Sequence, residues 1–567
     1  MLHNNSMHCP AYSENSLSIY LGGSCMSSEA NNDNQKDCDE VNIERSDMAE
    51  GEPNSYFYFA WSFAAESGHQ GDYLSKETLE KLGWNRLGKA DDLCCRSSES
   101  AVPDIHSYID RYAVWQYLGN DARQIFGDLN PSGHSEEDEG FCHIYTMEAG
   151  PSDRYIIKGR DNKREAFSYE LVLEGLELHC YTFGCGVLWI KTHGTFNEPK
   201  DTKRITEAGR RTCIPYIPDS CDRAPHVNAT KLILNIGDKH CVFDPVQSLE
   251  DVKNKKKPML PENIDFFRPI LMGESGEFHA KPLNDDRMFV MELIRDRKLS
   301  LDLRSPGDGI RSWSANPTNK ETVDFQKSIY EYVYIDMDDD CCCQDTQMCT
   351  ELLNDAIMPR WADAGTIYAA TNYSFVCLMD ANPELNASVA RVYLNQYIYI
   401  ASLVLAQRMG LASYSQRAGR ISAVPRGKDK HKNSARSYRE LAGLQREFVA
   451  FENQMLIGEI SNQQPGIELY KLLSDQLRIG EEQESLNEQL GSLYEVMNSG
   501  VGDSISRLGL WLALVAVLAD FAKDIIENLI DNHVWEIPYL EGLGGLAAIV
   551  GITFAIIYYV VPNRKHV

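Results

Sequence analysis

The pattern of apolar residues divides the chain into a polar beginning, a strand-rich middle and a helical end. Residues 1–54 show no apolar periodicity and are rich in Ser, Asn, Asp and Glu, which predicts a disordered segment. Residues 55–383 carry short aromatic and β-branched runs among a few helical patterns, which predict an α+β domain dominated by antiparallel strands. From residue 384 onward, apolar positions recur at helical spacing, which predicts long helices.

The strands predicted in the middle part share a high content of Tyr, Phe, Val and Ile. They are 55–61, 141–147, 153–159, a pair within 167–194, 230–237, 287–294, 329–336 and a pair within 365–379. The turn of the first pair contains Gly184 and Gly186, and glycine allows the positive φ that a tight turn needs. Helices are expected at about 199–211 and 350–363.

The helical part begins with a predicted hairpin region, 384–465, in which the stretch 387–416 is apolar on most faces and is expected to be buried. Next, 466–506 carries leucines near heptad spacing, interrupted around Gly480, which predicts a stalk helix. A continuous helix over 466–522 would be roughly 85 Å long. So long a helix favours packing against copies of the chain, and thus an oligomer.

The last apolar run, 543–561, carries no charge and would span about 28 Å as a helix, close to the thickness of a bilayer core. It predicts a second transmembrane helix, because a core helix of this length without charge is rare in a soluble protein. Arg564 and Lys565 follow in the basic tail 562–567. By the positive-inside rule they place the C-terminus in the cytoplasm.

A first transmembrane helix is predicted over 507–526. Its apolar run is too short to cross a bilayer alone, so the helix must include the polar residues on both sides of it. The acidic loop 527–542 is then expected to lie outside the cell. Both termini are then cytoplasmic, and so is the domain at 55–383. One face of the first span and its flanks carries small, polar and acidic residues: Gly502, Ser506, Gly509, Ala513, Ala516, Asp520, Asp524 and Glu527. This face either packs tightly against another helix or lines a pore with acidic rings that attract cations, and the acidic end favours the pore.

Composition excludes several classes of protein. The net charge of −28 over 567 residues argues against nucleic-acid binding through a general basic surface. The 16 cysteines include adjacent pairs but no C-x-x-C, and no signal peptide is recognisable, so reduced thiols are expected rather than disulfides or structural zinc. The chain lacks G-x-S-x-G, P-loop and H-E-x-x-H motifs. We therefore expect no enzyme.

Two charged segments have two interpretations each. The acidic group before Cys341 consists of Asp336, Asp338, Asp339 and Asp340. Such hard carboxylates suit Mg²⁺ or Ca²⁺, but a solvated acidic loop is the favoured interpretation. The basic linker 417–432 could contact anionic headgroups or a phosphate-bearing ligand, and a solvated loop is again favoured.

The order of elements resembles the CorA divalent-cation transporter superfamily: a soluble domain, antiparallel helices, a stalk entering the first span, a short outer loop, a second span and a basic tail. The outer-loop stretch 535–540 (WEIPYL) also looks like that superfamily's segment before its second span. The resemblance implies a homopentamer with a pore lined by the first span. The chain departs from it at 520–524 (DFAKD), where the family's Gly-Met-Asn selectivity signature would lie. This departure counts against Mg²⁺ transport.

A narrower resemblance rests on several short motifs in a fixed order. They are Gly184–Leu188, Ile205–Arg211, Asp285–Phe289, Arg360–Trp361, Gly365–Tyr368, Thr371–Val376 and Gln407–Arg408. Together they resemble the CorA-like proteins that accompany type III CRISPR systems in bacteria. The resemblance implies an antiviral effector of the bacterial inner membrane, gated by a nucleotide second messenger in which S-adenosylmethionine is joined to AMP.

Such a nucleotide would need cationic forks for its phosphate and an aromatic side chain for its base. The candidate forks are Arg210, Arg211, Arg287, Arg360 and Arg408. Trp361 and Tyr373 could stack on the base. For each arginine the alternative is a structural salt bridge. Three hypotheses therefore remain open: a ligand-gated membrane effector, a divalent-cation transporter, and a membrane-anchored scaffold without a pore.

Overall fold

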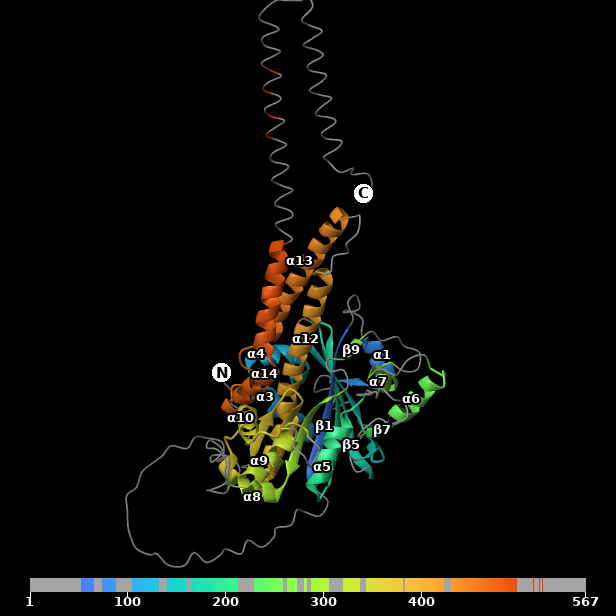
Figure 1. Ribbon diagram of the computed structural model, residues 1–567, viewed down its shortest axis with the longest axis vertical. Helices are drawn as coiled ribbons and strands as arrows, with labels where there is room; N and C mark the ends of the chain where they lie inside the picture. Colours follow the sequence, from blue (N-terminus) through green and yellow to red (C-terminus); the bar gives the residue numbers. More distant parts are fainter. Residues whose placement is uncertain are drawn as a thin grey trace, which may run out of the picture. The chain divides into compact units, whose positions relative to one another are not determined.

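One mixed β-sheet organises the part of the chain that the structure, a computed structural model, describes (Figure 1). That part comprises residues 53–65, 74–87, 105–131, 140–160, 165–212, 229–257, 263–272, 280–282, 287–304, 320–336, 343–380, 383–422 and 430–496, with Ala513, Ala516, Asp520 and Lys523. All of it belongs to a single compact unit, Met48–Val567.

The sheet has 13 strands, and its main path runs β11-β12-β13-β10-β1-β6-β5-β4-β7-β8. All pairs are antiparallel except β10 with β13, which are parallel. The strands are β1 Ser55–Ala65, β2 Asn85–Arg86, β3 Cys142–Glu148, β4 Arg154–Arg160, β5 Ala166–Tyr181, β6 Cys185–Gly194, β7 Ala229–Ile236, β8 Lys239–Phe243, β9 Ala280–Pro282, β10 Phe289–Arg295, β11 Ile357–Met358, β12 Ile367–Ala370 and β13 Ser374–Met379.

Helices cover both faces of this sheet, and residues 479–496 form one more helix after the last named one. The named helices are α1 Lys76–Lys81, α3 Ile105–Tyr117, α4 Asn120–Ile125, η1 Gly127–Leu129, α5 Pro199–Gly209, α6 Pro245–Lys253, α7 Asn263–Leu271, α8 Arg297–Arg304, α9 Lys320–Val333, α10 Thr346–Ala356, η4 Ala362–Ala364, α11 Pro383–Val392, the π-helical turn η5 Tyr393–Tyr397, α12 Ile398–Ser422, α13 Lys430–Met455 and α14 Gln464–Gln476.

Alternation along β1 builds two cores, one on each face of the sheet. Phe57, Phe59 and Trp61 are buried in the core that α5, α7, α8, α9 and α10 cover. Tyr58 and Ala60 are buried in the opposite core, which α3, α4, α12, α13 and α14 cover. The helical region after residue 384 therefore shares a hydrophobic core with the sheet, and its helices pack directly on the strands.

Helix α12 is the central element of the second core. Trp189 in β6 donates to the Ser402 hydroxyl at 2.6 Å, and the Gln407 amide donates to the Met455 carbonyl at 2.7 Å and to the Tyr470 hydroxyl at 2.8 Å. In the described residues, the stretch Ser388–Ser422 alone is long and apolar enough to cross a membrane, and 72% of its most apolar window is buried inside the protein. These contacts identify α12 as a core helix, as its apolar pattern predicts.

The spans expected at 507–526 and 543–561 lie outside the described residues, apart from four positions. Ala513, Ala516 and Asp520 of the expected pore face are helical and exposed in the single chain. The other members of that face lie outside the described part, as do residues 1–52, the outer-loop stretch 535–540 and the tail. The two-span topology stays a prediction.

Most of the expected strands are confirmed, including the hairpin β5–β6, in which Gly184 has a φ of 89°. The strand expected at 329–336 is wrong, because this stretch forms the end of helix α9 and the turn after it. Its Tyr, Ile and Val favour a strand, but Ile329, Tyr332 and Val333 are buried at helical spacing. Packing on the sheet therefore overrides local propensity here.

Two further expectations about helices are corrected. The helix expected at 350–363 ends at Ala356, where the short strand β11 begins. The basic linker expected at 417–432 is helical through Ser422 and again from Lys430, and the residues between lie outside the described part. The stalk breaks close to Gly480, where the leucine spacing is interrupted: α14 ends at Gln476, two turn residues follow, and a new helix begins at residue 479, so a helix over 466–522 is not continuous.

Gly410 in α12 offers a test of the packing around that helix. A Cβ atom at Gly410 would collide with the ring of Phe451 and approach the ring of Phe183 to 3.1 Å, whereas a Cβ at Gly419 of the same helix meets nothing within 4 Å. We expect Gly410→Ala to destabilise the full-length protein by about 1–3 kcal/mol through overpacking. Gly419→Ala should instead stabilise it by about 0.5–1 kcal/mol through helix propensity.

Urea unfolding of the two variants checks this pair. Equal stabilities for Gly410→Ala and Gly419→Ala would contradict the close packing of α12 against α13.

Candidate anion-binding site

The start of β10 brings together four of the residues that the sequence proposes as ligand contacts. The amide of Met288 donates to the Arg210 carbonyl at 2.8 Å, which places the end of α5 beside the strand. Arg211 and Arg287 form an antiparallel bridge at the same point. An amide of β10 donates to the Tyr373 carbonyl at 3.0 Å from the other side. We call Arg210, Arg211, Arg287 and Tyr373 the arginine cluster.

A close approach of α5 to the sheet buries the first of these arginines. At Gly209, a Cβ atom would lie 2.7 Å from side-chain atoms of both Ile157 and Phe59, so only glycine fits there. The Tyr155 hydroxyl donates to the Gly209 carbonyl at 2.5 Å. The helix therefore ends against the core, and the next residue, Arg210, is 1% exposed.

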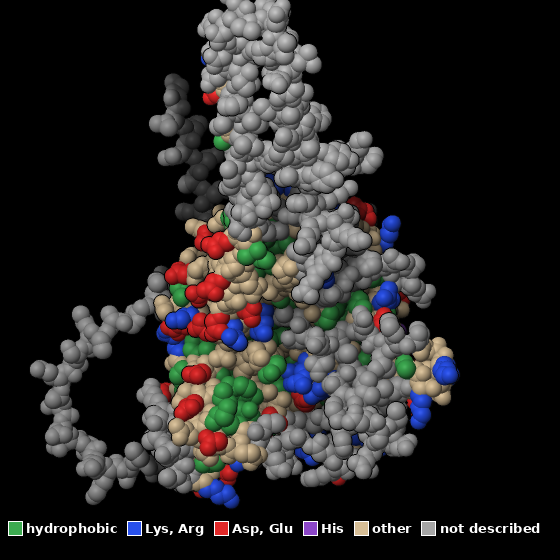
Figure 2. All heavy atoms as spheres, turned by 45° about the horizontal axis from the view of Figure 1, so that its top comes forward, with side chains coloured by type: hydrophobic (Ala, Val, Ile, Leu, Met, Phe, Trp, Pro, Cys, Tyr) green, Lys and Arg blue, Asp and Glu red, His purple; other side chains and the backbone are tan. Residues whose placement is uncertain are grey.

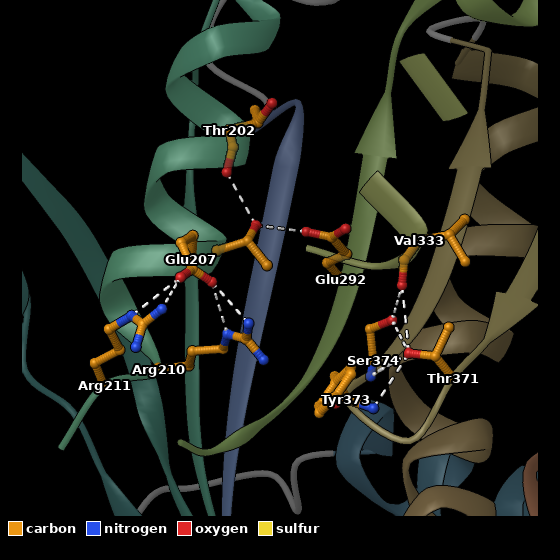
Figure 3. Close-up of polar contacts among 10 residues, drawn as sticks. Thr202, Glu207, Arg210, Arg211, Glu292, Val333, Thr371, Tyr373 and Ser374 are labelled. Atoms are coloured by element: carbon orange, nitrogen blue, oxygen red, sulfur yellow. Dashed lines mark hydrogen bonds and ion pairs between the residues drawn. The ribbon is translucent and has the colours of Figure 1, made fainter. Parts of the chain in front are cut away.

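One carboxylate, Glu207, binds two guanidinium groups (Figure 3). The Arg210 Nε and Nη2 atoms donate to Glu207 Oε2 at 3.1 and 2.7 Å, and the Arg211 Nε donates to Oε1 at 3.0 Å. Burial raises the pKa of Glu207, but the charges and hydrogen bonds of the two arginines lower it more. The carboxyl is therefore ionised at neutral pH.

The guanidinium groups of the cluster lie close enough to act on one another. The pKa of Arg210 is lowered, first by burial and then by the positive charges of Arg287 and Arg211, so three guanidinium groups repel one another here. The Nη1 atom of Arg210 is buried and has no hydrogen-bond partner among the described residues. A buried donor in this condition is costly, and an anion would relieve both the cost and the repulsion.

Tyr373 presents its ring beside this charge. The Arg210 guanidinium carbon lies 5.6 Å from the ring centroid, and the tyrosine is 37% exposed. The turn that carries it is fixed because the Thr371 hydroxyl accepts from the amides of Tyr373 and Ser374 at 3.2 and 3.1 Å. The Ser374 hydroxyl in turn donates to the Val333 carbonyl of α9, as Figure 3 shows. The backbone of the turn that carries the ring is thus fixed.

Glu292 on β10 lies behind the cluster and is fully buried. The Thr206 hydroxyl oxygen is 2.6 Å from Glu292 Oε2 and 2.9 Å from the Thr202 carbonyl. One hydroxyl proton cannot serve two acceptors, so the network is complete only when a protonated Glu292 donates to Thr206 and Thr206 donates to Thr202. In agreement, burial raises the pKa of Glu292 to about 7, despite the hydrogen bond of Thr206 and the charges of Arg210 and Lys203.

Arg408 extends the cluster toward the helices of the second core. Tyr373 lies within electrostatic range of the Arg408 guanidinium, so the two side chains are near one another. Its Nη1 atom donates to the Leu477 carbonyl at 3.4 Å. Five of the seven predicted ligand residues therefore belong to one neighbourhood.

Arg360 and Trp361 have other partners. The Arg360 Nε donates to Glu468 of α14 at 2.8 Å, which is the structural salt bridge considered as the alternative for each arginine. The Trp361 ring packs edge-on against Tyr368 at 5.5 Å. Arg360 thus links the β11–β12 region to α14, and Trp361 packs within that region.

The expected metal site remains a prediction. Asp336 is half-buried after α9, and the other three aspartates lie outside the described residues. Among the described residues, no group of three or more His, Cys, Asp or Glu side chains could hold a metal ion.

The two carboxylates of the site, Glu207 and Glu292, are not among the residues predicted from the sequence. Glu207 lies three and four residues before Arg210 and Arg211, the spacing at which helical side chains meet, and this signal could have identified it. No comparable signal exists for Glu292, because only the packing of α5 on β10 brings it to Thr206.

Comparison of the chain with protein-family models, curated proteins and solved structures found no match.

We expect Glu207→Gln to destabilise the protein by about 3–5 kcal/mol, because it leaves the buried Arg210 guanidinium without an ionic partner. Glu80→Gln is the matched control, since Glu80 pairs with Lys76 at 3.8 Å in an exposed position. That change should cost less than about 1 kcal/mol. Equal losses in denaturant unfolding would contradict the role given to Glu207.

The protonation of Glu292 predicts a pH dependence of stability. Because its folded pKa of about 7 lies above the usual 4.5, the native state binds more protons between these values, and stability falls as pH rises through 7. Relative to Glu292→Gln, the wild type should lose about 3 kcal/mol between pH 4.5 and 8, at about 1.4 kcal/mol per pKa unit. Denaturant unfolding of both proteins across this range measures the difference, and a constant difference would show that Glu292 is ionised throughout.

Proposed function

We propose that this chain is a ligand-gated membrane effector that binds an anionic nucleotide at the arginine cluster. The observation that carries the proposal is the buried Nη1 atom of Arg210, a donor without a hydrogen-bond partner among the described residues, beside two further guanidinium groups. Arg guanidinium groups are the preferred partners of phosphate oxygens in proteins. The protein has a net charge of −28, and the face drawn in Figure 2 carries many acidic side chains. Several arginines gathered at one point of such a protein therefore suggest a binding function.

The geometry also suits a base. The exposed ring of Tyr373 lies beside Arg210, and stacking on an aromatic ring contributes about 1–3 kcal/mol per base. In the proposed complex, the phosphate lies against the guanidinium groups and the base lies on Tyr373. The resemblance to CorA-like effectors of type III CRISPR systems suggests the S-adenosylmethionine–AMP conjugate as the ligand.

The proposed output is ion flow through the C-terminal spans. In this proposal the chain is a homopentamer of the bacterial inner membrane with both termini in the cytoplasm, and residues 507–526 line the pore. Asp520, which is helical and exposed in the single chain, would contribute to an acidic ring that attracts cations. Opening such a pore during infection would stop growth of the cell.

Replacement of the Tyr373 ring tests the proposed binding mode. Tyr373→Ala should weaken binding of the S-adenosylmethionine–AMP conjugate at least tenfold, because it removes a stacking surface. Tyr373→Phe retains the ring and should bind within about threefold of the wild type. Isothermal titration calorimetry of the full-length protein in detergent, at two salt concentrations, checks both, and affinity should fall at higher salt because the ligand is anionic.

No binding by the wild type would remove the nucleotide from the proposal. Equal binding by Tyr373→Ala and the wild type would place the ligand elsewhere.

A further inference from the structure

The stalk is broken at a defined point, between α14 and the helix 479–496. Leu477 and Arg478 are turn residues, and Arg478 has a φ of 57°, in the left-handed region that a non-glycine residue rarely adopts. Both sides of the break are packed, since Leu477 is 1% and Ile479 6% exposed. Strain of this kind persists only where surrounding contacts hold it in place.

Arg408 of α12 supplies one of these contacts. Its Nη1 atom donates to the Leu477 carbonyl at 3.4 Å. The last carbonyls of a helix lack partners within the helix and carry its negative dipole end, so a cation beside them stabilises termination at that point. The Arg478 side chain contributes locally, because its Nε donates to Glu481 Oε2 at 2.7 Å.

The helix after the break is fastened to α13. The Gln483 and Asn487 amides both donate to Glu452 Oε1 at 2.9 Å. Leu486 and Leu490 are buried in the same core as α12. A change at residues 477–478 would therefore turn or shift a packed helix that leads along the chain to the proposed first span.

Arg408 also lies near the arginine cluster. Besides burial, the charges of Glu482 and Arg478 near the break act on its guanidinium, and Tyr373 of the cluster lies within electrostatic range of it. Tyr373 lies against Arg210, whose guanidinium carbon is 5.6 Å from its ring. The hydrogen bond of Arg408 to Leu477 links this neighbourhood to the stalk.

We propose that Arg408 couples anion binding to the stalk: it caps the broken stalk at Leu477 in the empty protein and turns to the anion when the cluster is occupied. Without its cap, the broken arrangement loses stability relative to one in which the helix runs through Arg478 with right-handed φ. The anion thus shifts a population between two arrangements, as a ligand with different affinity for them must. This inference rests on the proposed function for its ligand, but not for the cap itself.

Hydrogen–deuterium exchange of the full-length protein in lipid nanodiscs tests the cap without any ligand. In Arg408→Gln, amides of residues 479–481 should exchange about fivefold more slowly than in the wild type, since a helix C-terminal cation contributes about 1 kcal/mol. The amides of Leu477, Arg478 and Glu482 already donate to backbone carbonyls in the broken arrangement. Arg408→Lys keeps the cation and should resemble the wild type. Arg446→Gln is the control for loss of a surface charge, because among the described residues the Arg446 side chain on α13 bonds only the backbone of its own helix, at Ala442.

The second arm adds the S-adenosylmethionine–AMP conjugate. The wild type should show the same slowing at residues 479–481, and Arg408→Gln should show no further change. Glycine adopts a positive φ without cost, so Arg478→Gly should favour the broken stalk. This variant should therefore reduce the slowing of exchange by the nucleotide about fivefold. Unchanged exchange in ligand-free Arg408→Gln would overturn the cap, whether or not the nucleotide binds. Slowing in that variant without nucleotide binding to the wild type would support the cap and remove the nucleotide from the proposed function.

Discussion

The candidate site depends on the hydrogen-bonded ion pairs of Glu207 with Arg210 and Arg211. They allow the Arg210 guanidinium to be buried at the edge of the sheet, where an unpaired charge would be too costly. Arg211 shares the same carboxylate, and the charge of Arg287 also acts on Arg210. The Arg210 Nη1 atom stays buried without a hydrogen-bond partner among the described residues, and this donor is the feature on which the proposed anion site rests.

The surrounding fold keeps this arrangement rigid and connects it to the helical part. Strand β10 lies between β1 and the parallel strand β13, so α5 and the Tyr373 turn are fixed on either side of its start. The core opposite α5 contains α12, and Arg408 on that helix lies within electrostatic range of Tyr373 and donates to the Leu477 carbonyl in the stalk. The site and the stalk thus belong to one packed unit.

Much of this architecture can be predicted from the sequence, and the predictions that are wrong have physical causes. Aromatic and β-branched runs identify β1, β5, β6 and the β12–β13 hairpin, because strands that are buried on both faces are rich in such residues. The same composition misleads at α9, where Tyr and Val pack on the sheet at helical spacing. The interrupted leucine spacing around Gly480 lies close to the stalk break, but the left-handed residue itself, Arg478, is not marked by a glycine.

The site was also predictable only in part. The resemblance directed attention to arginines in the right segments, and the fold brings Arg210, Arg211, Arg287 and Arg408 into one neighbourhood. Arg360 lies in an equally suggestive motif but pairs with Glu468 across more than a hundred residues of sequence. A side chain's partner across such a separation is set by tertiary packing, which local sequence patterns do not encode.

The central claim is that an anionic nucleotide opens a path for ions, and one measurement tests it most directly. Purified full-length protein is placed in liposomes that hold a cation-sensitive dye, and cation flux is recorded with and without the S-adenosylmethionine–AMP conjugate. The account predicts flux only when the nucleotide is present. Flux that ignores the nucleotide and follows Mg²⁺, or no flux under either condition, would contradict it and favour a transporter or a scaffold, respectively.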